Sequence, residues 1–341
     1  MVMSLSSHHI CNRIPSLTAK QIQICQQMPQ SLSIISYGIR LASDECQRQF
    51  RHKRWNCTLM NGNNIFTHIM FRGSREASYT HSIRSAGVTY AISEACSRGN
   101  ISFCSCHHIG SDGRTKTNSD SWQWSGCTTN IAYGIKLAKS FMDSTNDNEK
   151  RDSRAIMNLH NNNAGRKVGK NIIRCVKDLL VSRCKCHGVS GSCTARTCWK
   201  VLPPFTIIGD QLMKKYSNAK RVALHWRRRK GISYTKKKQP FFLKMRRISS
   251  NDRHIDLVPK SRDLVYLEKS INYCNKNPVM DSLGTSGRHC NKSSDAEDGC
   301  QSMCCGRGYR THESVTKWKC RCRFHYCCTV TCSECLQHRQ I

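Results

Sequence analysis

The chain has 341 residues, 24 of them cysteine, and its 55 Lys and Arg against 22 Asp and Glu give a formal net charge of +33. This length can bury one large hydrophobic core or two smaller ones, but the cysteine density indicates disulfides formed in an oxidising compartment and argues against a cytosolic protein. So large a charge excludes a chain without anionic partners, and nucleic acid, sulfated glycan and anionic lipid are the candidates.

The first half of the chain has the periodicity of helices. Apolar residues recur every three or four positions in four segments, which span 18–53, about 75–98, about 130–141 and about 150–181. In the first segment Thr18 and Gln21 form a capping-box pair, and Pro29 predicts a kink or a break. Ser74 starts the second segment and Gly99 stops it. The sequence therefore predicts a helical N-terminal domain.

The pattern changes to a period of two residues at Cys184, which indicates short β elements. The stretch 214–247 carries fourteen Lys or Arg and no Asp or Glu, and it is predicted to be a basic linker. The cysteine-dense end beyond it needs its bridges to stay folded. The expected fold is α+β and disulfide-rich. Its parts are a helical N-terminal domain (1–213) that includes a β-hairpin (184–199), a basic linker (214–262), and a small Cys-rich C-terminal domain (263–341) with a hairpin at about 315–339.

Zinc is the alternative to disulfides for clustered cysteines, because paired C-x-x-C motifs place four thiolates around one metal ion. Cys332 and Cys335 form the only C-x-x-C, whereas C-x-C recurs and puts both thiols on one side of a strand. The C-x-C motifs are Cys104/Cys106, Cys184/Cys186 and Cys320/Cys322. The spacing favours disulfides, and no metal site is predicted.

Two sets of cysteines have the arithmetic of antiparallel hairpins, in which facing residues have a nearly constant sum of residue numbers. The first set, with its tip at 187–192, consists of Cys184–Cys198 and Cys186–Cys193. The second set is longer, has a vicinal pair at its tip, and consists of Cys320–Cys335, Cys322–Cys332 and Cys327–Cys328. Other connectivities remain open on sequence alone.

The first hairpin contains the run CKCHGVSGSC at 184–193, completed by TCW at 197–199. Further segments accompany it in a fixed order: ECQRQFRHKRWNC at 45–57, MNLHNNNAGRK at 157–167, CCGRGY at 304–309 and FHYCC at 324–328. Together they resemble the signature of the Wnt family of secreted, lipid-modified signalling proteins. The resemblance implies a helical N-terminal domain that carries a disulfide-pinned thumb, and a Cys-rich C-terminal domain that extends an index finger.

In the Wnt family the serine at the thumb tip carries a monounsaturated acyl ester, which the membrane acyltransferase Porcupine adds in the endoplasmic reticulum. The matching residue is Ser190, and Ser192 is the local alternative. Gly188 and Gly191 are expected to leave the Ser190 hydroxyl exposed and to permit unusual dihedral angles. The resemblance thus implies a covalent fatty acyl group on Ser190 and no other cofactor.

The resemblance also implies the partners. The acyl chain is expected to lie in a groove of the Frizzled cysteine-rich domain, and low-density-lipoprotein-receptor-related proteins are the expected co-receptors. Because the acyl chain makes the free ligand insoluble, the carrier Wntless is expected during secretion. The finger tip is expected to contact the other side of the Frizzled domain, the alternative being a packed hairpin end. Its contact residues would be Tyr326, Cys327, Cys328 and Val330.

The family's pattern implies the remaining bridges, which are Cys11–Cys25, Cys46–Cys57, Cys96–Cys104, Cys106–Cys127, Cys274–Cys305 and Cys290–Cys300. It leaves Cys175 and Cys304 unpaired, because the family's usual partner of Cys304 lies beyond Ile341. Residues 1–10 lack the apolar run of about 7 to 15 residues that a signal peptide needs. Both ends are therefore expected to be truncated relative to a functional precursor.

The basic stretch has two interpretations, a solvated flexible linker or a segment that binds heparan sulfate. Nucleic acid is not expected as a partner, because no nucleic-acid-binding motif accompanies the charge. Three sequons, at Asn56, Asn100 and Asn291, are glycosylation candidates that fit passage through the secretory route. The candidates for glycan binding are Arg227, Arg228, Arg229, Lys230, Lys236, Lys237 and Lys238.

Two other classes of protein fit parts of the sequence. A lipid-free, glycan-binding extracellular matrix or growth-factor-like protein would share the charge and the cysteines. A hydrolase would need the G-x-S-x-G nucleophile elbow, but Ser192 stands at its fifth position, and the cysteines predict a hairpin instead of a strand-to-helix turn. The sequence therefore predicts a secreted Wnt-type ligand of the extracellular space and matrix, which acts by binding receptors and is not an enzyme.

Overall fold

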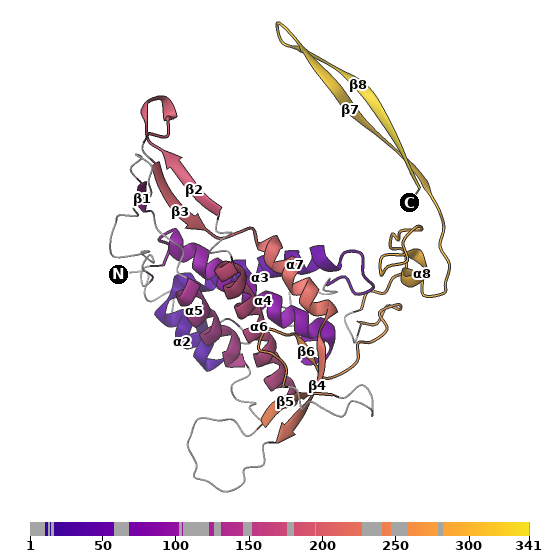
Figure 1. Ribbon diagram of the computed structural model, residues 1–341. Coiled ribbons are helices and arrows are strands. Elements are labelled where there is room, and N and C mark those ends of the chain that lie inside the picture. The colour runs from indigo at the N-terminus through magenta and orange to yellow at the C-terminus, as the bar shows by residue number, and fades with distance from the viewer. Residues whose placement is uncertain are drawn as a thin grey trace. The chain divides into compact units, whose positions relative to one another are not determined.

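The structure is a computed structural model, and it contains two compact units (Figure 1). Unit 1 comprises Met1–Gln49 and Asn63–Ser270, and unit 2 comprises Phe50–Gly62 and Ile271–Ile341. This division differs from the expected domains, because the segment Phe50–Gly62 belongs to the C-terminal unit and the expected linker belongs to unit 1. The described residues are 11, 12, 14, 17–57, 68–101, 104, 123–125, 131–145, 152–175, 181–194, 196–226, 241–246, 258–278 and 282–340.

Helices make up most of unit 1. They are α2 (Ala19–Gln27), α3 (Pro29–Phe50), η1 (His68–Phe71), α4 (Arg75–Ser97), α5 (Ile131–Asp143), α6 (Ser153–Cys175) and α7 (Phe205–Ser217). The expected first helix is divided in two, because Pro29 begins α3, a position where its missing N–H costs no hydrogen bond. Thr18 and Gln21 form the predicted capping box, and Ser74 caps α4 as predicted. Among the described residues, no helix is long and apolar enough to span a bilayer.

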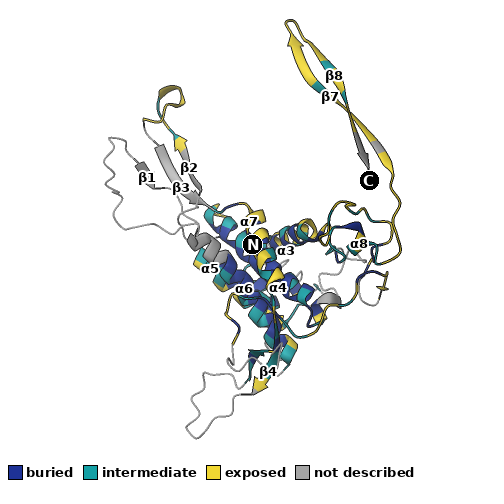
Figure 2. Ribbon diagram, turned by 45° about the vertical axis from the view of Figure 1, so that its right-hand side comes forward, coloured by how far each residue is buried: buried dark blue, intermediate teal, exposed yellow. Residues whose placement is uncertain are grey.

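Helix α4 is the centre of unit 1 and is buried along almost its whole length (Figure 2). It packs against α5, α6 and α7. Many of its buried side chains are Ala, Ser or Thr, and neighbouring backbones approach closely. A Cβ at Gly165 of α6 would overlap the carbonyl oxygen of Ser82, and one at Gly87 would overlap the carbonyl oxygen of Gly38 in α3. Small residues therefore occupy the positions at which larger side chains would keep the helices apart.

Buried polar side chains of α6 tie it to its neighbours. Arg166 donates two hydrogen bonds to the carboxylate of Asp143 in α5, at 2.9 and 2.8 Å, and a third to Ser85 of α4 at 3.1 Å. Asn161 donates to the carbonyl oxygen of Val265 at 2.9 Å and accepts from its N–H at 3.0 Å. The segment MNLHNNNAGRK therefore has a structural role, because its side chains join α6 to α5 and to strand β6 (Val265–Tyr266).

Two strands of a small three-stranded sheet lie within the stretch 214–262 that was expected to be a linker, and the third strand follows just after it. The strands β4 (Lys220–Trp226), β5 (Phe241–Met245) and β6 (Val265–Tyr266) have the order β5-β4-β6. Strand β4 is antiparallel to β5 and parallel to β6. Val222, Leu243 and Val265 are buried against Met157 of α6. The linker prediction was therefore wrong for β4 and β5, in which alternate apolar residues stand within a sequence rich in Lys and Arg.

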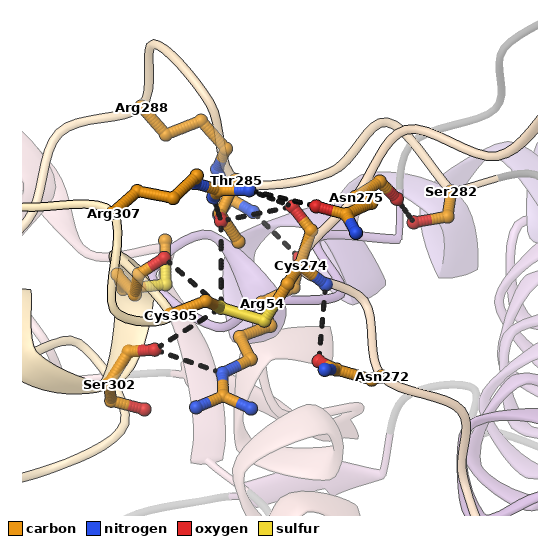
Figure 3. The surroundings of a disulfide bond; sticks show 11 residues. Arg54, Asn272, Cys274, Asn275, Ser282, Thr285, Arg288, Ser302, Cys305 and Arg307 are labelled. Carbon is orange, nitrogen blue, oxygen red and sulfur yellow. Dashed lines mark hydrogen bonds between the residues drawn. A yellow bond between two sulfur atoms is a disulfide. The ribbon is translucent and has the colours of Figure 1, made fainter.

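Disulfides and arginines hold unit 2 together (Figure 3). Cys274–Cys305 is one of the bridges, and Arg307 donates to the carbonyl oxygen of Cys274 at 2.9 Å and to the hydroxyl of Thr285. Helix α8 (Cys300–Met303) follows the bridge Cys290–Cys300. Arg288 donates to three backbone carbonyl oxygens, those of Arg51, Lys53 and Arg54. These bonds explain why the segment Phe50–Gly62 belongs to this unit.

The buried ring of His81 in α4 makes the stability of unit 1 dependent on pH. Burial, followed by the nearby Arg84 guanidinium, lowers the pKa of His81 from 6.5 to about 4. Because the pKa of His81 is lower in the folded state than in the unfolded state, the unfolded state binds this proton more readily. The free energy of unfolding therefore has its full value from this group above pH 6.5 and decreases as the pH falls toward 4. Between pH 7 and 4.5 the wild type should lose about 2 to 3 kcal/mol more free energy of unfolding than His81→Gln.

Urea denaturation followed by circular dichroism at both pH values measures this difference. His312→Gln is the matched control, because His312 is exposed, and it should lose as much stability as the wild type. Equal losses for the wild type and His81→Gln would contradict the prediction.

Candidate functional site

The thumb hairpin, residues 181–201, consists of strands β2 (Val181–Cys186) and β3 (Arg196–Val201). They pair antiparallel and place Cys184 directly opposite Cys198. Strand β1 (Gln123–Ser125) pairs in parallel with β3 and gives the hairpin a third strand. The predicted hairpin is thus confirmed. The side chains of Cys184 and Cys198 lie outside the described part of the structure, so their bridge stays a prediction.

The tip of the thumb hairpin is held by covalent and backbone bonds. The bridge Cys186–Cys193 spans it, and the N–H of Gly188 donates to the carbonyl oxygen of Ser192 at 2.8 Å. Between them lies the short 3-10 helix η3 (Val189–Gly191). A Cβ at Gly188 would overlap the hydroxyls of Ser192 and Thr194. The tip therefore requires glycine at this position and forms a closed turn.

Ser190 lies at the apex of this turn in the left-handed conformation, with φ 57° and ψ 26°. Such a conformation is uncommon for a residue with a side chain and persists where the surroundings enforce it. The Ser190 side chain is exposed, and Val189 beside it is 90% exposed. No described residue hydrogen-bonds to the Ser190 hydroxyl, whereas the hydroxyls of Ser192 and Thr194 hydrogen-bond at 3.4 Å. Of the two serines, Ser190 therefore presents the freer hydroxyl.

The chain returns from the tip as strand β3 and does not enter a helix. A nucleophile elbow needs a strand followed directly by a helix. The thumb hairpin thus lacks the strand-to-helix geometry that the nucleophile elbow of an α/β-hydrolase would require at Ser190.

The finger hairpin, residues 313–340, consists of strands β7 (Glu313–His325) and β8 (Thr329–Gln340). The predicted bridges Cys320–Cys335 and Cys322–Cys332 are present. A register shift between Cys320 and Arg323, with φ 48° at Arg321, marks a β-bulge. Nearly all described side chains of the hairpin are exposed (Figure 2). Because two strands alone are marginally stable, the bridges are needed to hold the hairpin.

Large apolar side chains gather at the finger tip. Tyr326 is 99% exposed, Phe324 70% and Val330 60%. Phe324 pairs directly with Val330, so both side chains lie on one face of the hairpin. Phe324 was not among the predicted contact residues, although the same pairing arithmetic that aligned the cysteines points to it. The tip is therefore a broader apolar surface than the sequence indicated.

Cys327 and Cys328 are free thiols, which contradicts the predicted vicinal bridge. Their backbones are left-handed, with φ 70° and 76°, and they form the turn between His325 and Thr329. This turn is closed by the strand ladder on both sides, so it forms without a covalent bond between the two residues.

The other cysteines agree with the implied pattern where the structure describes them. Cys46 and Cys57 are each disulfide-bonded, and Cys304 is a free thiol. Cys106, Cys127 and the side chain of Cys175 lie outside the part of the chain that the structure describes. Among the described residues, no group of three or more His, Cys, Asp or Glu is placed to hold a metal ion. The remaining implied bridges are present: Cys11–Cys25, Cys96–Cys104, Cys274–Cys305 and Cys290–Cys300.

The predicted glycan-binding cations, at 227–230 and 236–238, lie outside the described residues, between β4 and β5. Of the three sequons, Asn100 and Asn291 are exposed and Asn56 is half-buried. The side-chain oxygen of Asn291 accepts a hydrogen bond from the hydroxyl of Ser293 at 2.9 Å.

Two disulfide-bonded hairpins with exposed tips are the geometry of a disulfide-rich protein ligand, because each tip offers surface for contact with a partner. The Wnt family model matches residues 13–341. Protein Wnt-2 of Drosophila melanogaster is 42% identical over 338 residues, which covers 98% of this chain and 92% of that protein. The chain therefore belongs to the Wnt family, whose members are developmental signalling ligands and not enzymes.

One solved structure agrees with this assignment. The structure of human WLS in complex with WNT8A matches with a TM-score of 0.54 and 32% identity, over 90% of this chain and 91% of that chain. The N-terminal domain and linker of Drosophila WntD match with a TM-score of 0.42 and 19% identity, over 72% of this chain and 98% of that chain. The predicted α+β, disulfide-rich fold is confirmed by the first of these.

Proposed function

We propose that this protein is a secreted Wnt ligand that binds Frizzled-type receptors through an acyl group on Ser190 and through the tip of the finger hairpin. The single observation that carries the proposal is the exposed, left-handed Ser190 at the apex of a disulfide-closed turn, with a hydroxyl that no described residue binds. Family membership supports the acyl ester and secretion into the extracellular space and matrix.

The acyl group would dominate receptor affinity. Burying a chain of roughly fourteen methylenes at about 0.8 kcal/mol each contributes on the order of 11 kcal/mol before ordering costs. In water the same chain would expose this apolar area, so the ligand needs a membrane enzyme and a carrier, for which we propose Porcupine and Wntless. The matched WNT8A was solved in complex with human WLS, which supports a carrier of that kind.

The finger tip is the proposed second contact with the Frizzled cysteine-rich domain. Phe324, Tyr326 and Val330 are exposed at this tip, where Cys327 and Cys328 form the turn. An aromatic side chain such as Tyr326 supplies contact area at low cost in conformational entropy. Low-density-lipoprotein-receptor-related co-receptors complete the proposed signalling complex.

Mass spectrometry of the tryptic fragment 186–196 tests the proposal. The protein would be expressed with a signal peptide in cells that contain the acyltransferase. We expect a mass increase of one unsaturated sixteen-carbon acyl group on Ser190, and no increase in Ser190→Ala. An unmodified Ser190 and Ser192 in secreted protein would overturn the proposal and would favour a lipid-free matrix or growth-factor-like protein, whereas an acyl group on Ser192 would overturn the assignment to Ser190 alone.

Heparan sulfate is a second proposed ligand. The net charge of +33 and the fourteen cations of 214–247, without any acidic residue, favour a sulfated polyanion. The cations between β4 and β5, at 227–230 and 236–238, are the proposed binding residues. Asn56, Asn100 and Asn291 are proposed glycosylation sites, and their exposure favours Asn100 and Asn291.

A further inference from the structure

The finger hairpin is a two-stranded sheet, and among the described strands no third one pairs with β7 or β8. Each strand therefore has one free edge with a row of backbone N–H and C=O groups, which is a template for an added strand. Figure 2 shows exposed residues along both strands. A two-stranded hairpin gains stability when further strands join it. The two free edges differ in how well they are protected against such pairing.

The edge of β7 is protected. It carries a row of exposed cations, and a β-bulge interrupts its ladder. Charged side chains and bulges are common means of keeping an edge strand from pairing. A second β7 beside the first would also place cations against cations, which destabilises a sheet. The cations are Lys317, Lys319, Arg321 and Arg323.

The edge of β8 lacks these protections. The side chains described in β8, from Thr329 to Gln337, include no Lys, Arg or Pro, and Glu334 is the one charged residue among them. The extra residue of the bulge belongs to β7, so β8 itself runs without interruption. Strand β8 therefore presents a nearly neutral edge that is open to pairing.

Two copies of β8 can pair with each other only in certain registers. Backbone groups of alternate residues point to the free edge, so facing residues of identical antiparallel strands must both be odd-numbered or both even-numbered. The register that centres on Ser333 meets this condition. It places Val330 opposite Leu336 of the second copy, because both residues lie three positions from Ser333.

This register extends an apolar row across the joined sheet. Phe324 pairs with Val330 within each hairpin, and Lys317 pairs with Leu336. Val330 and Leu336 are even-numbered residues of one strand, so their side chains lie on the same face. Phe324, Val330 and Leu336 are 70%, 60% and 56% exposed in the single chain. Pairing of two copies would bring Val330 and Leu336 into contact twice, once on each side of the two-fold axis.

The charges of the hairpin are compatible with this pairing. In the register centred on Ser333, Glu334 stands opposite Cys332 of the second copy, so the two carboxylates do not face each other directly. The β7 strands become the outer strands of the joined sheet. Their cations are then three strand spacings apart, about 14 Å, which exceeds the Debye length of about 8 Å at physiological ionic strength.

We propose that the finger hairpin pairs with the finger hairpin of a second copy of this chain, edge to edge through β8, in the antiparallel register centred on Ser333. The product is a four-stranded sheet with two-fold symmetry and the strand order β7-β8-β8-β7. The pairing uses a free edge, so the turn with Tyr326, Cys327 and Cys328 stays open for the receptor contact proposed above. It does not depend on an acyl group.

Sedimentation velocity of the full chain tests the proposal over roughly 1 to 100 µM protein. The parent protein is Ser190→Ala, which removes the proposed acyl site and makes detergent unnecessary. Its free thiols are alkylated first, so that an intermolecular disulfide cannot imitate the pairing. We expect the mass to rise with concentration from one chain of 39.0 kDa toward two chains.

Two charge variants of the parent probe the register. S333K and S333E each place like charges opposite each other at the two-fold axis, so each variant alone should dimerise about tenfold or more weakly than the parent. An equimolar mixture should regain the dimer, because Lys then faces Glu. T316K is the matched control, since it adds the same ammonium group at an exposed position of β7, and it should dimerise like the parent.

The remaining outcomes each contradict the proposal. All variants should share the parent's circular dichroism spectrum, because Ser333 and Thr316 are exposed. A parent that stays monomeric at the highest concentration would overturn the pairing, and a dimer that persists in both S333K and S333E would place the association elsewhere. Loss of the dimer in T316K would implicate β7 instead of β8. A mixture of S333K and S333E that remains monomeric would show that the register is wrong.

Discussion

Replacement of Ser190 by alanine is expected to abolish measurable binding to a Frizzled cysteine-rich domain. The substitution removes the attachment point of the acyl chain, and with it on the order of 11 kcal/mol of apolar burial. If ordering costs offset half of this, the remaining roughly 5 kcal/mol still corresponds to more than about 1,000-fold in affinity. Biolayer interferometry of the detergent-solubilised protein on an immobilised Frizzled domain measures the change.

Ser192→Ala is the matched control for this experiment. It removes a hydroxyl two residues away, whose described contact is with Thr194, and it should leave both acylation and affinity near the wild-type values. Both serines are exposed, so the circular dichroism spectra should be unchanged. Wild-type affinity in Ser190→Ala would refute the lipid mechanism, and loss of affinity in Ser192→Ala alone would move the acyl site.

The finger tip and the acyl group on the thumb hairpin are expected to contribute separately to receptor affinity. Tyr326 is 99% exposed, so a substitution there leaves the fold intact and removes contact area alone. An aromatic side chain of this kind contributes a few kcal/mol at most, which is less than the acyl chain. The finger tip therefore adjusts affinity and receptor preference, while the acyl group sets whether binding occurs.

The helices and hairpins could be predicted because their signals are local. Thr18, Ser74 and Pro29 act within one helical turn. The helix starts predicted at Thr18 and Ser74 and the break predicted at Pro29 are confirmed. The hairpin cysteines were aligned by a sum rule that depends only on antiparallel pairing. The register agrees with it for Cys184 and Cys198, whereas in the finger hairpin Cys320 faces Ser333, two residues from its bridge partner Cys335. Short-range chemistry of this kind is independent of the rest of the fold.

The missed features depend on distant partners. Helix α7 has Phe205, Ile208 and Leu212 at helical spacing, yet it adjoins a cation-rich stretch that indicated a linker. The burial of Val222 in β4 depends on Met157 of α6, 65 residues earlier. Nothing near the segment Phe50–Gly62 shows that its carbonyl groups accept hydrogen bonds from Arg288. Such contacts between distant segments leave little trace in any single window of sequence.

Asp143→Asn should destabilise unit 1 by about 3 to 5 kcal/mol, because it leaves the buried guanidinium of Arg166 without its counter-charge. The Arg166 side chain is only 3% exposed. The exposed pair of Arg98 and Glu94 is the control, with side chains 66% and 24% exposed, and Glu94→Gln should cost less than about 1 kcal/mol. Urea denaturation at pH 7 measures both values.

The double variant D143L/R166M should recover most of the loss, because apolar replacement of both partners leaves no buried charge. Equal effects of Asp143→Asn and Glu94→Gln would show that the buried pair is no more important than a surface one.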